Sequence, residues 1–147
     1  MGYTMSQFLD ALEAVESGGV CNAVGDMGKS IGPLQIGRAY YRDAWGTEEG
    51  YEELATAPAG TAPNDETARL KSRQTAKRYM KRYAGGCAAT ANASVAELRH
   101  LEAMARVHNG GPAACRVGHA QWAATTGYWG KVEKQIAKLR PAGSEQA

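Results

Sequence analysis

Residues 13–35 read EAVESGGVCNAVGDMGKSIGPLQ, and this stretch decides how the chain folds and where its candidate chemistry lies. An apolar helical pattern ends here in a carboxylate, Glu16. Ser-Gly-Gly follows at 17–19 and stops the helix, because glycine readily adopts the left-handed backbone of a helix C-terminus. A second carboxylate, Asp26, stands ten positions after Glu16 among further glycines. The five glycines and one proline of 18–34 predict a loop with room for a small hairpin.

Periodic apolar residues predict helices on both sides of this loop. The preceding helix is expected over 6–16, with Thr4 and Ser6 as candidates for its N-cap. The helices that follow are expected over 34–45, over 65–83, from a capping box at Ser94 and Glu97 to the NGGP at 109–112, and over 128–139. Between the first two of these, the acidic and Ala/Pro/Thr-rich segment 46–64 is expected to form an irregular surface excursion.

Length and composition indicate one globular domain. The chain has 147 residues, 44% hydrophobic and 22% charged, which is ordinary for a soluble globular protein. We therefore predict a single domain over 1–140 and a disordered tail over 141–147. The expected fold class is mainly α (α+β), with a small Gly-rich β or loop lobe beside a helical lobe.

Charge and hydropathy argue against membrane and nucleic-acid partners. No apolar run approaches the roughly 18 residues that span a bilayer, so we expect no membrane insertion. MGYTMSQFLDALEA at the N-terminus lacks the basic and apolar regions of a signal peptide. The net charge of +2 is too small to indicate nucleic-acid binding. Seven Lys/Arg residues in 69–82 are expected to form a solvated helix face, with electrostatic steering of an anionic polymer as the alternative.

The three cysteines, Cys21, Cys87 and Cys115, permit at most one internal disulfide and leave one thiol over. They lack paired C-x-x-C spacing, so we expect no zinc site, and nothing in the sequence indicates another metal or a cofactor. A chain of this length does not need a disulfide to fold. We therefore expect reducing agents to leave the melting temperature nearly unchanged.

The two acids of the opening stretch have the asymmetry that glycoside hydrolysis uses. One carboxyl must be held protonated and another ionised, which requires unlike surroundings. Glu16, in the last turn of an apolar helix, is expected to have a raised pKa from desolvation and the helix dipole. Asp26, in a polar loop, is expected to stay ionised. The alternative is that Glu16 is a solvated helix end and Asp26 a turn residue; spacing alone leaves both open.

Six sequence blocks along most of the chain add evidence on the roles of Glu16 and Asp26. ESG at 16–18, GDMGKSIGPLQI at 25–36 and AYYRDA at 39–44 are followed by RYMKRYA at 78–84, ARVHNGGPAAC at 105–115 and TGYWGKV at 126–132. In this order they resemble the invertebrate-type lysozyme family, also called the destabilase family. The ESG to QI part is shared with lytic transglycosylases and other lysozyme-like folds, whereas HNGGP with its cysteine, followed by GYW, is more specific.

The resemblance implies a lysozyme-like fold and a glycosidase that cleaves the β-1,4 bond between N-acetylmuramic acid and N-acetylglucosamine in peptidoglycan. It implies Glu16 as general acid and Asp26 as nucleophile in a retaining mechanism, in which the two carboxyl groups approach to about 5 Å. The positions that it implies for substrate binding are Gln35, Ile36, Arg38, Tyr40, Tyr83, His108, Asn109 and Gly110. Of these, Ile36 and Tyr40 are alternatively core residues, and His108 alternatively structural.

Other activities stay open beside this one. A lytic transglycosylase needs a single acid and leaves a 1,6-anhydro product, and a non-catalytic glycan-binding module would need neither. Some members of the family cleave isopeptide bonds through a serine and a histidine; Ser30 and His108 are the nearest equivalents, but Ser30 stands one position beyond the expected spacing.

The few cysteines depart from the family's disulfide-rich pattern. We therefore expect either a secreted antimicrobial enzyme directed at the cell wall or an endolysin-like enzyme made in the cytoplasm.

Overall fold

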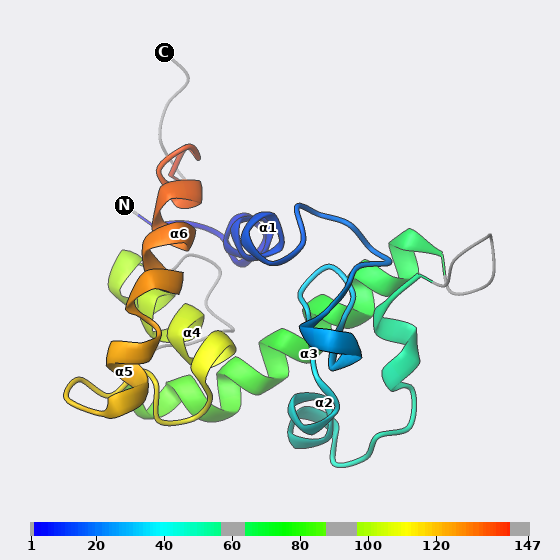
Figure 1. The fold of residues 1–147 in the computed structure, drawn as a ribbon. Coiled ribbons are helices and arrows are strands. Elements are labelled where there is room, and N and C mark those ends of the chain that lie inside the picture. Colours follow the sequence, from blue (N-terminus) through cyan, green and yellow to red (C-terminus); the bar gives the residue numbers. More distant parts are fainter. Residues whose placement is uncertain (1, 57–63, 88–96, 142–147) are drawn as a thin grey trace. The chain divides into compact units, whose positions relative to one another are not determined.

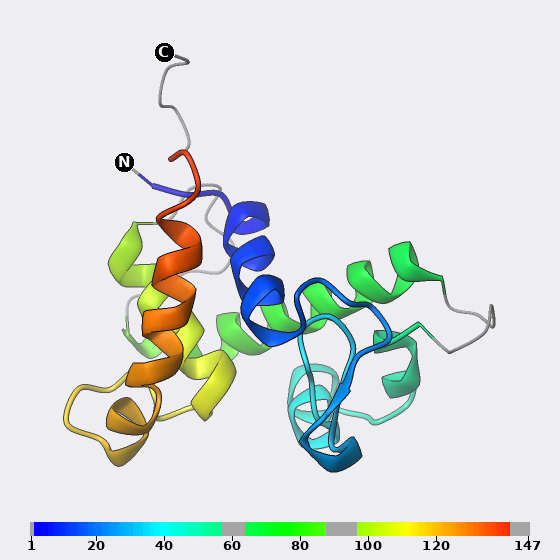
Figure 2. The ribbon, with the colours of Figure 1, turned by 45° about the horizontal axis from the view of Figure 1, so that its top comes forward.

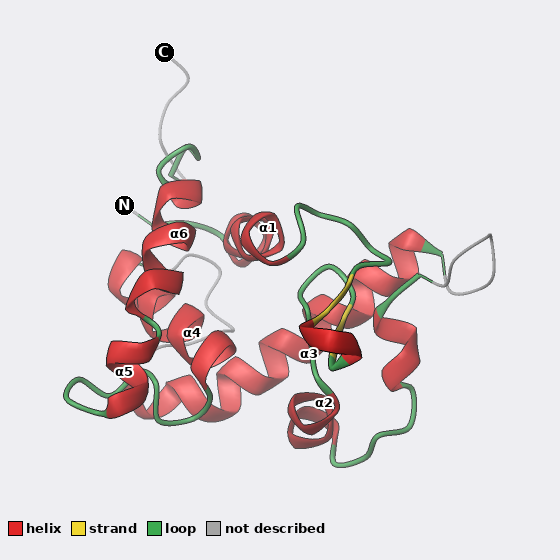
Figure 3. Cartoon of the chain, in the orientation of Figure 1, coloured by secondary structure: helices red, strands yellow, loops and turns green. Residues whose placement is uncertain are grey.

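The computed structural model describes residues 2–56, 64–87 and 97–141. Within them helices dominate and one small antiparallel sheet of two strands is present, as Figure 3 shows. This confirms the predicted mainly α class with a small Gly-rich β lobe. The chain groups into two compact units, Glu13–Tyr79 and the combination of Met1–Leu12 with Met80–Ala147. The predicted single domain stays a prediction, and residues 142–147 of the predicted tail lie outside the described residues.

The unit Glu13–Tyr79 contains the Gly-rich lobe. In chain order it includes the end of α1 (Met5–Glu16), β1 (Val24–Gly25), the 3-10 turn η1 (Asp26–Gly28), β2 (Ser30–Ile31), α2 (Arg38–Trp45), the 3-10 turn η2 (Tyr51–Leu54) and most of α3 (Asp65–Ala84), all labelled or coloured by position in Figure 1. Strand β1 pairs with β2 so that Val24 faces Ile31 and Gly25 faces Ser30. The predicted small hairpin is thereby confirmed.

Helix α2 begins at Arg38, later than the predicted start at 34. The reason is that Ile36 forms an isolated bridge with Ile31 and so extends the hairpin. Gln35 between them has φ 50, a left-handed conformation that no helix accepts. Leu34 and Ile36 are both buried, which explains why an apolar pattern alone included them in the helix.

Two of the long helices begin at the side-chain caps that their sequences allow. At the start of α1, the Thr4 hydroxyl accepts from the Gln7 N–H at 3.1 Å, and the Gln7 side chain accepts from the Thr4 N–H at 2.9 Å. This is a capping box, and it identifies Thr4 rather than Ser6 as the cap. At the start of α3, Asn64 Oδ1 accepts from the N–H of Thr67 at 2.9 Å.

The other unit is built on helices of the C-terminal half. After the 3-10 turn η4 (Gly85–Cys87) come α4 (Leu98–Gly110), α5 (Ala120–Ala124) and α6 (Thr126–Ile136). Helix α4 lies beside α6, and α5 contacts both (Figures 1 and 2). The fully buried side chains of this unit include Phe8, Leu12, Met80, Leu101, Met104, Val107, Val132 and Ile136. Ser94 of the predicted capping box lies outside the described residues, and the pattern missed the short α5.

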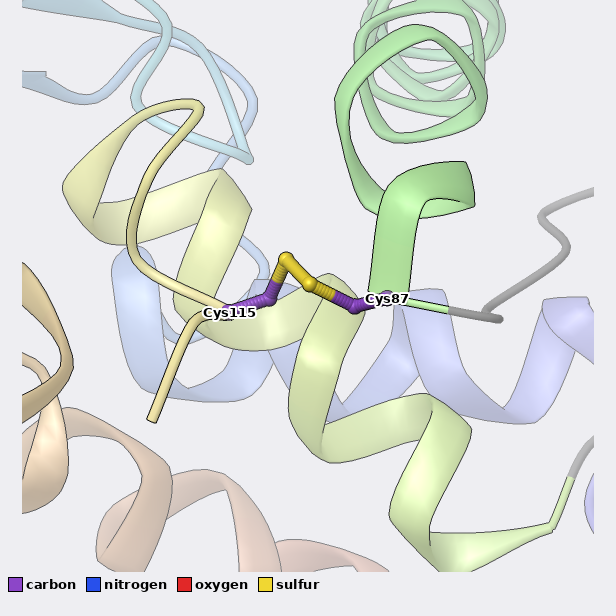
Figure 4. The surroundings of a disulfide bond; sticks show 2 residues. All are labelled: Cys87 and Cys115. Carbon is purple, nitrogen blue, oxygen red and sulfur yellow. A yellow bond between two sulfur atoms is a disulfide. The ribbon is translucent and has the colours of Figure 1, made fainter. Parts of the chain in front are cut away.

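A disulfide joins Cys87 and Cys115 within this unit (Figure 4). The third cysteine, Cys21, is a buried free thiol in the unit Glu13–Tyr79. The sequence had allowed one bridge without deciding the pair.

Among the described residues, no helix combines the length and the apolar character needed to cross a bilayer.

Much of the basic face of α3 is engaged in contacts rather than merely solvated. Lys71 lies 5.0 Å from the ring centre of Trp45 and Arg78 lies 4.2 Å from it, so two cations flank one indole. Arg78 also donates to the carbonyl of Ala44 at 2.9 Å. These cation–π contacts fasten α2 to α3, and the expectation of a simply solvated helix face needs that correction.

Candidate active site

The predicted site residues are divided between the two units. Both carboxylates, Glu16 and Asp26, belong to the unit Glu13–Tyr79. The same unit holds the predicted binding residues Gln35, Ile36, Arg38 and Tyr40. The other unit holds Tyr83, His108, Asn109 and Gly110. Each set is best understood from its own surroundings, and the contribution of both to one site stays a prediction.

Glu16 is the last residue of α1 and is partly buried. It lies within electrostatic range of an aromatic pair from two other helices. Tyr40 of α2 stacks on Tyr79 of α3, with ring centroids 3.7 Å apart and planes at 12°. Burial raises the pKa of the Tyr40 hydroxyl well above its ordinary value, and Tyr79 and the charge of Glu16 raise it further. The Tyr40 hydroxyl therefore stays neutral beside Glu16 at physiological pH.

The end of α1 is held by a buried ion pair that the sequence did not predict. Glu13 is 4% exposed, and its carboxylate accepts from Arg69 Nε at 3.0 Å and from Arg73 Nε at 2.6 Å. Arg69 also donates to the carbonyl of Gly19 at 3.0 Å, which ties the loop after Glu16 to α3. The hydrogen bond that Arg69 donates to Glu13 is the main cause of the raised pKa of Arg69. The i,i+4 spacing of the two arginines places them on one face of α3 but does not indicate their partner.

Asp26 is exposed at the turn between β1 and β2, and its backbone is unusual. Asp26 has φ 51, Met27 has φ 57 and Gly28 has φ 89, so three successive residues are left-handed. For a residue with a side chain this conformation costs on the order of 1–2 kcal/mol. Met27 is 98% exposed, so packing does not compensate for its cost. Such strain collects at functional sites, which makes this tip a candidate for one.

Gln35 and Ile36 are built into the base of the same hairpin. The Gln35 side chain donates to the carbonyls of Ala23 at 3.2 Å and Gly32 at 2.9 Å. Ile36 is 1% exposed, and its carbonyl accepts from the Tyr51 hydroxyl at 2.8 Å. The side chain of Ile36 thus lies in the core, and the contact with substrate predicted for each residue stays a prediction.

Arg38 lies at the start of α2 with its side chain largely exposed. It forms ion pairs with Glu52 at 3.1 Å and Glu48 at 3.7 Å, and its guanidinium lies 4.6 Å from the ring centre of Tyr51. The Glu52 carboxylate accepts a hydrogen bond from its own backbone, which is the main cause of its lowered pKa, and a second from Arg38, which lowers the pKa further. Arg38 is accessible to a ligand, though it already has acidic neighbours.

In the other unit, three of the four predicted residues lie at the end of α4, and the fourth, Tyr83, lies in α3. His108 is buried at 7% exposure, whereas Asn109 is exposed. A Cβ on Gly110 would lie 2.4 Å from the Thr125 Cγ2, so packing against that residue requires glycine here. Tyr83 of α3 is partly exposed, with the guanidinium of Arg82 5.3 Å from its ring centre. Substrate contact by these four residues stays a prediction.

A buried arginine organises the helices around this end of α4. Arg106, 3% exposed, pairs with Glu102 at 2.9 Å and lies 3.6 Å from the ring centre of Trp122. It also donates to the Trp122 carbonyl and to the hydroxyls of Thr125 and Thr126. Arg106 was not predicted from the sequence, although the block ARVHNGGP contains it. Within the described parts of the chain, no group of three His, Cys, Asp or Glu residues is arranged to hold a metal ion.

Comparisons with known proteins agree with this architecture. No protein-family profile matches the chain. A lysozyme of Meretrix lusoria is 32% identical over 139 residues, covering 90% of this chain and 91% of that protein. Among solved structures, a chain of the crystal structure of Aeromonas hydrophila PliI in complex with Meretrix lusoria lysozyme superposes with a TM-score of 0.58 at 28% identity, covering 91% of this chain and 92% of that chain. The match extends over both units and over the blocks from ESG to GYW, and with it the lysozyme-like fold is confirmed: the chain belongs to the invertebrate-type lysozyme family.

Proposed function

We propose that this protein is a lysozyme that hydrolyses the β-1,4 bond between N-acetylmuramic acid and N-acetylglucosamine in peptidoglycan. The observation that carries the proposal is the presence, in one unit, of two acids in unlike surroundings. Glu16 is partly buried at the end of a helix beside the stacked Tyr40 and Tyr79, and Asp26 is exposed at a strained tip. This asymmetry is what acid and nucleophile require.

In the proposed reaction, Glu16 donates its proton to the leaving glycosidic oxygen while an Asp26 oxygen attacks the anomeric carbon. The bond to the leaving sugar breaks and a covalent glycosyl-enzyme ester forms. Glu16, now ionised, then removes a proton from a water molecule that attacks the same carbon and releases Asp26. Two inversions at one carbon give net retention of configuration. The wall polymer is the site of action, reached by secretion or by an endolysin-like route.

Clearing of bacterial cell suspensions tests this proposal. Glu16→Gln and Asp26→Asn should each lower the lysis rate by at least about 100-fold, because each removes a group that transfers a proton or forms a bond. Asp10→Asn, an exposed acid on the same helix, serves as the control and should behave as the wild type. Wild-type rates in both of the first two variants would exclude the proposed mechanism.

Product analysis separates the proposed hydrolase from a lytic transglycosylase. Mass spectrometry of digested peptidoglycan should show a reducing N-acetylmuramic acid end that has gained one water. A transglycosylase would give the 1,6-anhydro end instead and would tolerate Asp26→Asn. Binding of glycan without any turnover would indicate a non-catalytic module.

A further inference from the structure

The Gln35 side chain locks the hairpin that carries Asp26. Its Nε2 donates to the carbonyl of Ala23, just before β1, and to that of Gly32, just after β2. The backbone repeats this link, since the Gly32 N–H donates to the Ala23 carbonyl at 2.9 Å and the Gln35 N–H to the Gly32 carbonyl at 3.1 Å. One amide thus joins both strands at the base of the hairpin.

The Oε1 atom of the Gln35 amide occupies the space where a side chain at Gly25, the residue directly before Asp26, would lie. A Cβ built on Gly25 would lie 2.2 Å from Gln35 Oε1 and 3.3 Å from its Cδ. The backbone of Gly25, at φ −127 and ψ 179, is extended and suits any residue. A side chain at position 25 would therefore displace the Gln35 amide from its present position, although the backbone conformation there suits any residue.

We propose that Gln35 is a positioning residue for the Asp26 carboxylate, acting through Gly25; this rests on the proposed function, in which Asp26 is the nucleophile. Asp26 and Met27 occupy a strained backbone and need surrounding structure to keep them there. The lock fixes the strand end from which that strained turn starts. A shift of about 1 Å at a reacting group can cost about 100-fold in rate, so holding this strand end matters for chemistry.

The contact with Gly25 is tested first by stability, independently of activity. Gly25→Ala should lower the thermal midpoint by roughly 3–8 °C, because the new methyl forces the Gln35 amide off its two carbonyls. In a Gln35→Ala background the obstructing oxygen is gone, and the same Gly25→Ala change should cost no more than about 1 °C. Equal costs of Gly25→Ala in both backgrounds would overturn the lock.

Kinetics on a soluble peptidoglycan fragment then test the link to Asp26. Gln35→Ala and Gly25→Ala should each lower kcat by about 10- to 100-fold and change KM less than about two-fold, since the position of the nucleophile is altered and not the glycan contact. Val24→Ala, a change at an exposed side chain of the same strand, is the matched control and should alter neither constant. All variants are compared below the lowest thermal midpoint.

The opposite split would identify another role. If Gln35→Ala raises KM and leaves kcat unchanged, its side chain contacts the glycan and the positioning role is wrong. Gln35→Glu separates donation from shape: its carboxylate cannot donate to the carbonyls of Ala23 and Gly32, so it should be as slow as Gln35→Ala. A fully active Asp26→Asn variant would instead refute the proposed function, in which Asp26 is the nucleophile. The stability measurements on the Gly25 and Gln35 variants would still test the contact between these two residues.

Discussion

At the scale of single residues, the tip of the hairpin holds the greatest departure from a relaxed backbone. Asp26 and Met27 are both left-handed although each carries a side chain, and glycine follows only at the third position. Sequence reasoning identified Asp26 as a turn residue or a catalytic acid but could not see this strain. A sequence under selection for stability alone would place glycine or asparagine at the Met27 position. The observed backbone favours the functional interpretation of the tip.

The buried Tyr40 hydroxyl predicts a loss of stability at alkaline pH. Its pKa in the folded state is raised above the ordinary value of about 10. At pH values between the ordinary and the folded pKa, the native state therefore keeps a proton that the unfolded state releases. Its contribution is complete below about pH 10 and is lost as the pH rises toward the folded value. The pKa of Tyr51 and of the Cys21 thiol are also raised, mainly by burial, and act in the same direction.

Urea unfolding between about pH 8 and pH 11 measures this effect. The free energy of unfolding of the wild type should fall across the upper half of the range. Tyr40→Phe, which cannot ionise, should show a shallower fall. Parallel pH curves for the two proteins would show that the Tyr40 hydroxyl does not contribute.

At the scale of elements, the ion pairs of Glu13 with Arg69 and Arg73 form a clamp that holds the end of α1 on α3. The Glu13 carboxylate in this clamp is buried, not solvated. Glu13 lies one turn before Glu16 in the same helix, yet nothing in the local sequence indicates that it is buried and paired. Its partners, Arg69 and Arg73, lie 56 and 60 positions away. Sequence periodicity predicts which helices exist, but not which charged side chains meet between them.

Breaking this clamp should be costly. Glu13→Gln leaves two arginines without their carboxylate, and we expect the free energy of unfolding to fall by about 2–4 kcal/mol, somewhat below a fully buried pair because the Arg69 side chain is 40% exposed. Glu97→Gln is the matched control, since the side chains of Glu97 and Arg99 are 64% and 77% exposed; it should change stability by less than about 0.5 kcal/mol. Denaturant midpoints decide the comparison, and equal effects would refute the clamp.

The helices were the most predictable elements, for physical reasons. Helix α1 and helix α3 have periodic apolar residues, cap residues at their starts and glycines at their ends, so their bounds followed closely. Helix α2 was predicted to start early, because Leu34 and Ile36 are apolar whether they lie in a helix or in the base of a hairpin. The five-residue α5 was missed because so short an element has too few turns to show a period.

The candidate site was predictable to a different degree. The family resemblance predicted Glu16 and Asp26 as the two catalytic acids, which stays a prediction, and the structure adds what surrounds them. Gln35 was predicted as a substrate contact, whereas its hydrogen bonds lie within the hairpin. Such a role depends on side-chain geometry between positions 23, 25 and 32, which a sequence pattern does not contain.

At the scale of the whole molecule, the covalent link between Cys87 and Cys115 revises the expectation for reducing conditions. Three cysteines could pair in three ways or not at all, and the sequence did not choose. The observed disulfide connects residues 28 positions apart, and the loop that it closes contains the whole of α4. It restricts the unfolded chain, which is the main way that disulfides stabilise folded proteins in the chain-entropy account.

Reduction should therefore lower stability, contrary to the expectation from length alone. Closing a loop of this size contributes about 3–4 kcal/mol, so adding reductant should lower the melting temperature by roughly 6–15 °C. A Cys87→Ser/Cys115→Ser double variant should melt at the lower temperature with and without reductant. An unchanged wild-type midpoint after confirmed reduction would show that the bridge is energetically silent.

The third cysteine, Cys21, can report on the opening of the loop in which it lies. Cys21 lies buried in the loop between Glu16 and Asp26, while the other two cysteines are bonded to each other. A thiol reagent can reach it only when that loop opens, and while the loop is closed burial raises the pKa of the thiol and so disfavours the reactive thiolate. The rate of chemical labelling of the Cys21 thiol therefore measures how often the loop between the two proposed catalytic acids opens, and no engineered probe is needed.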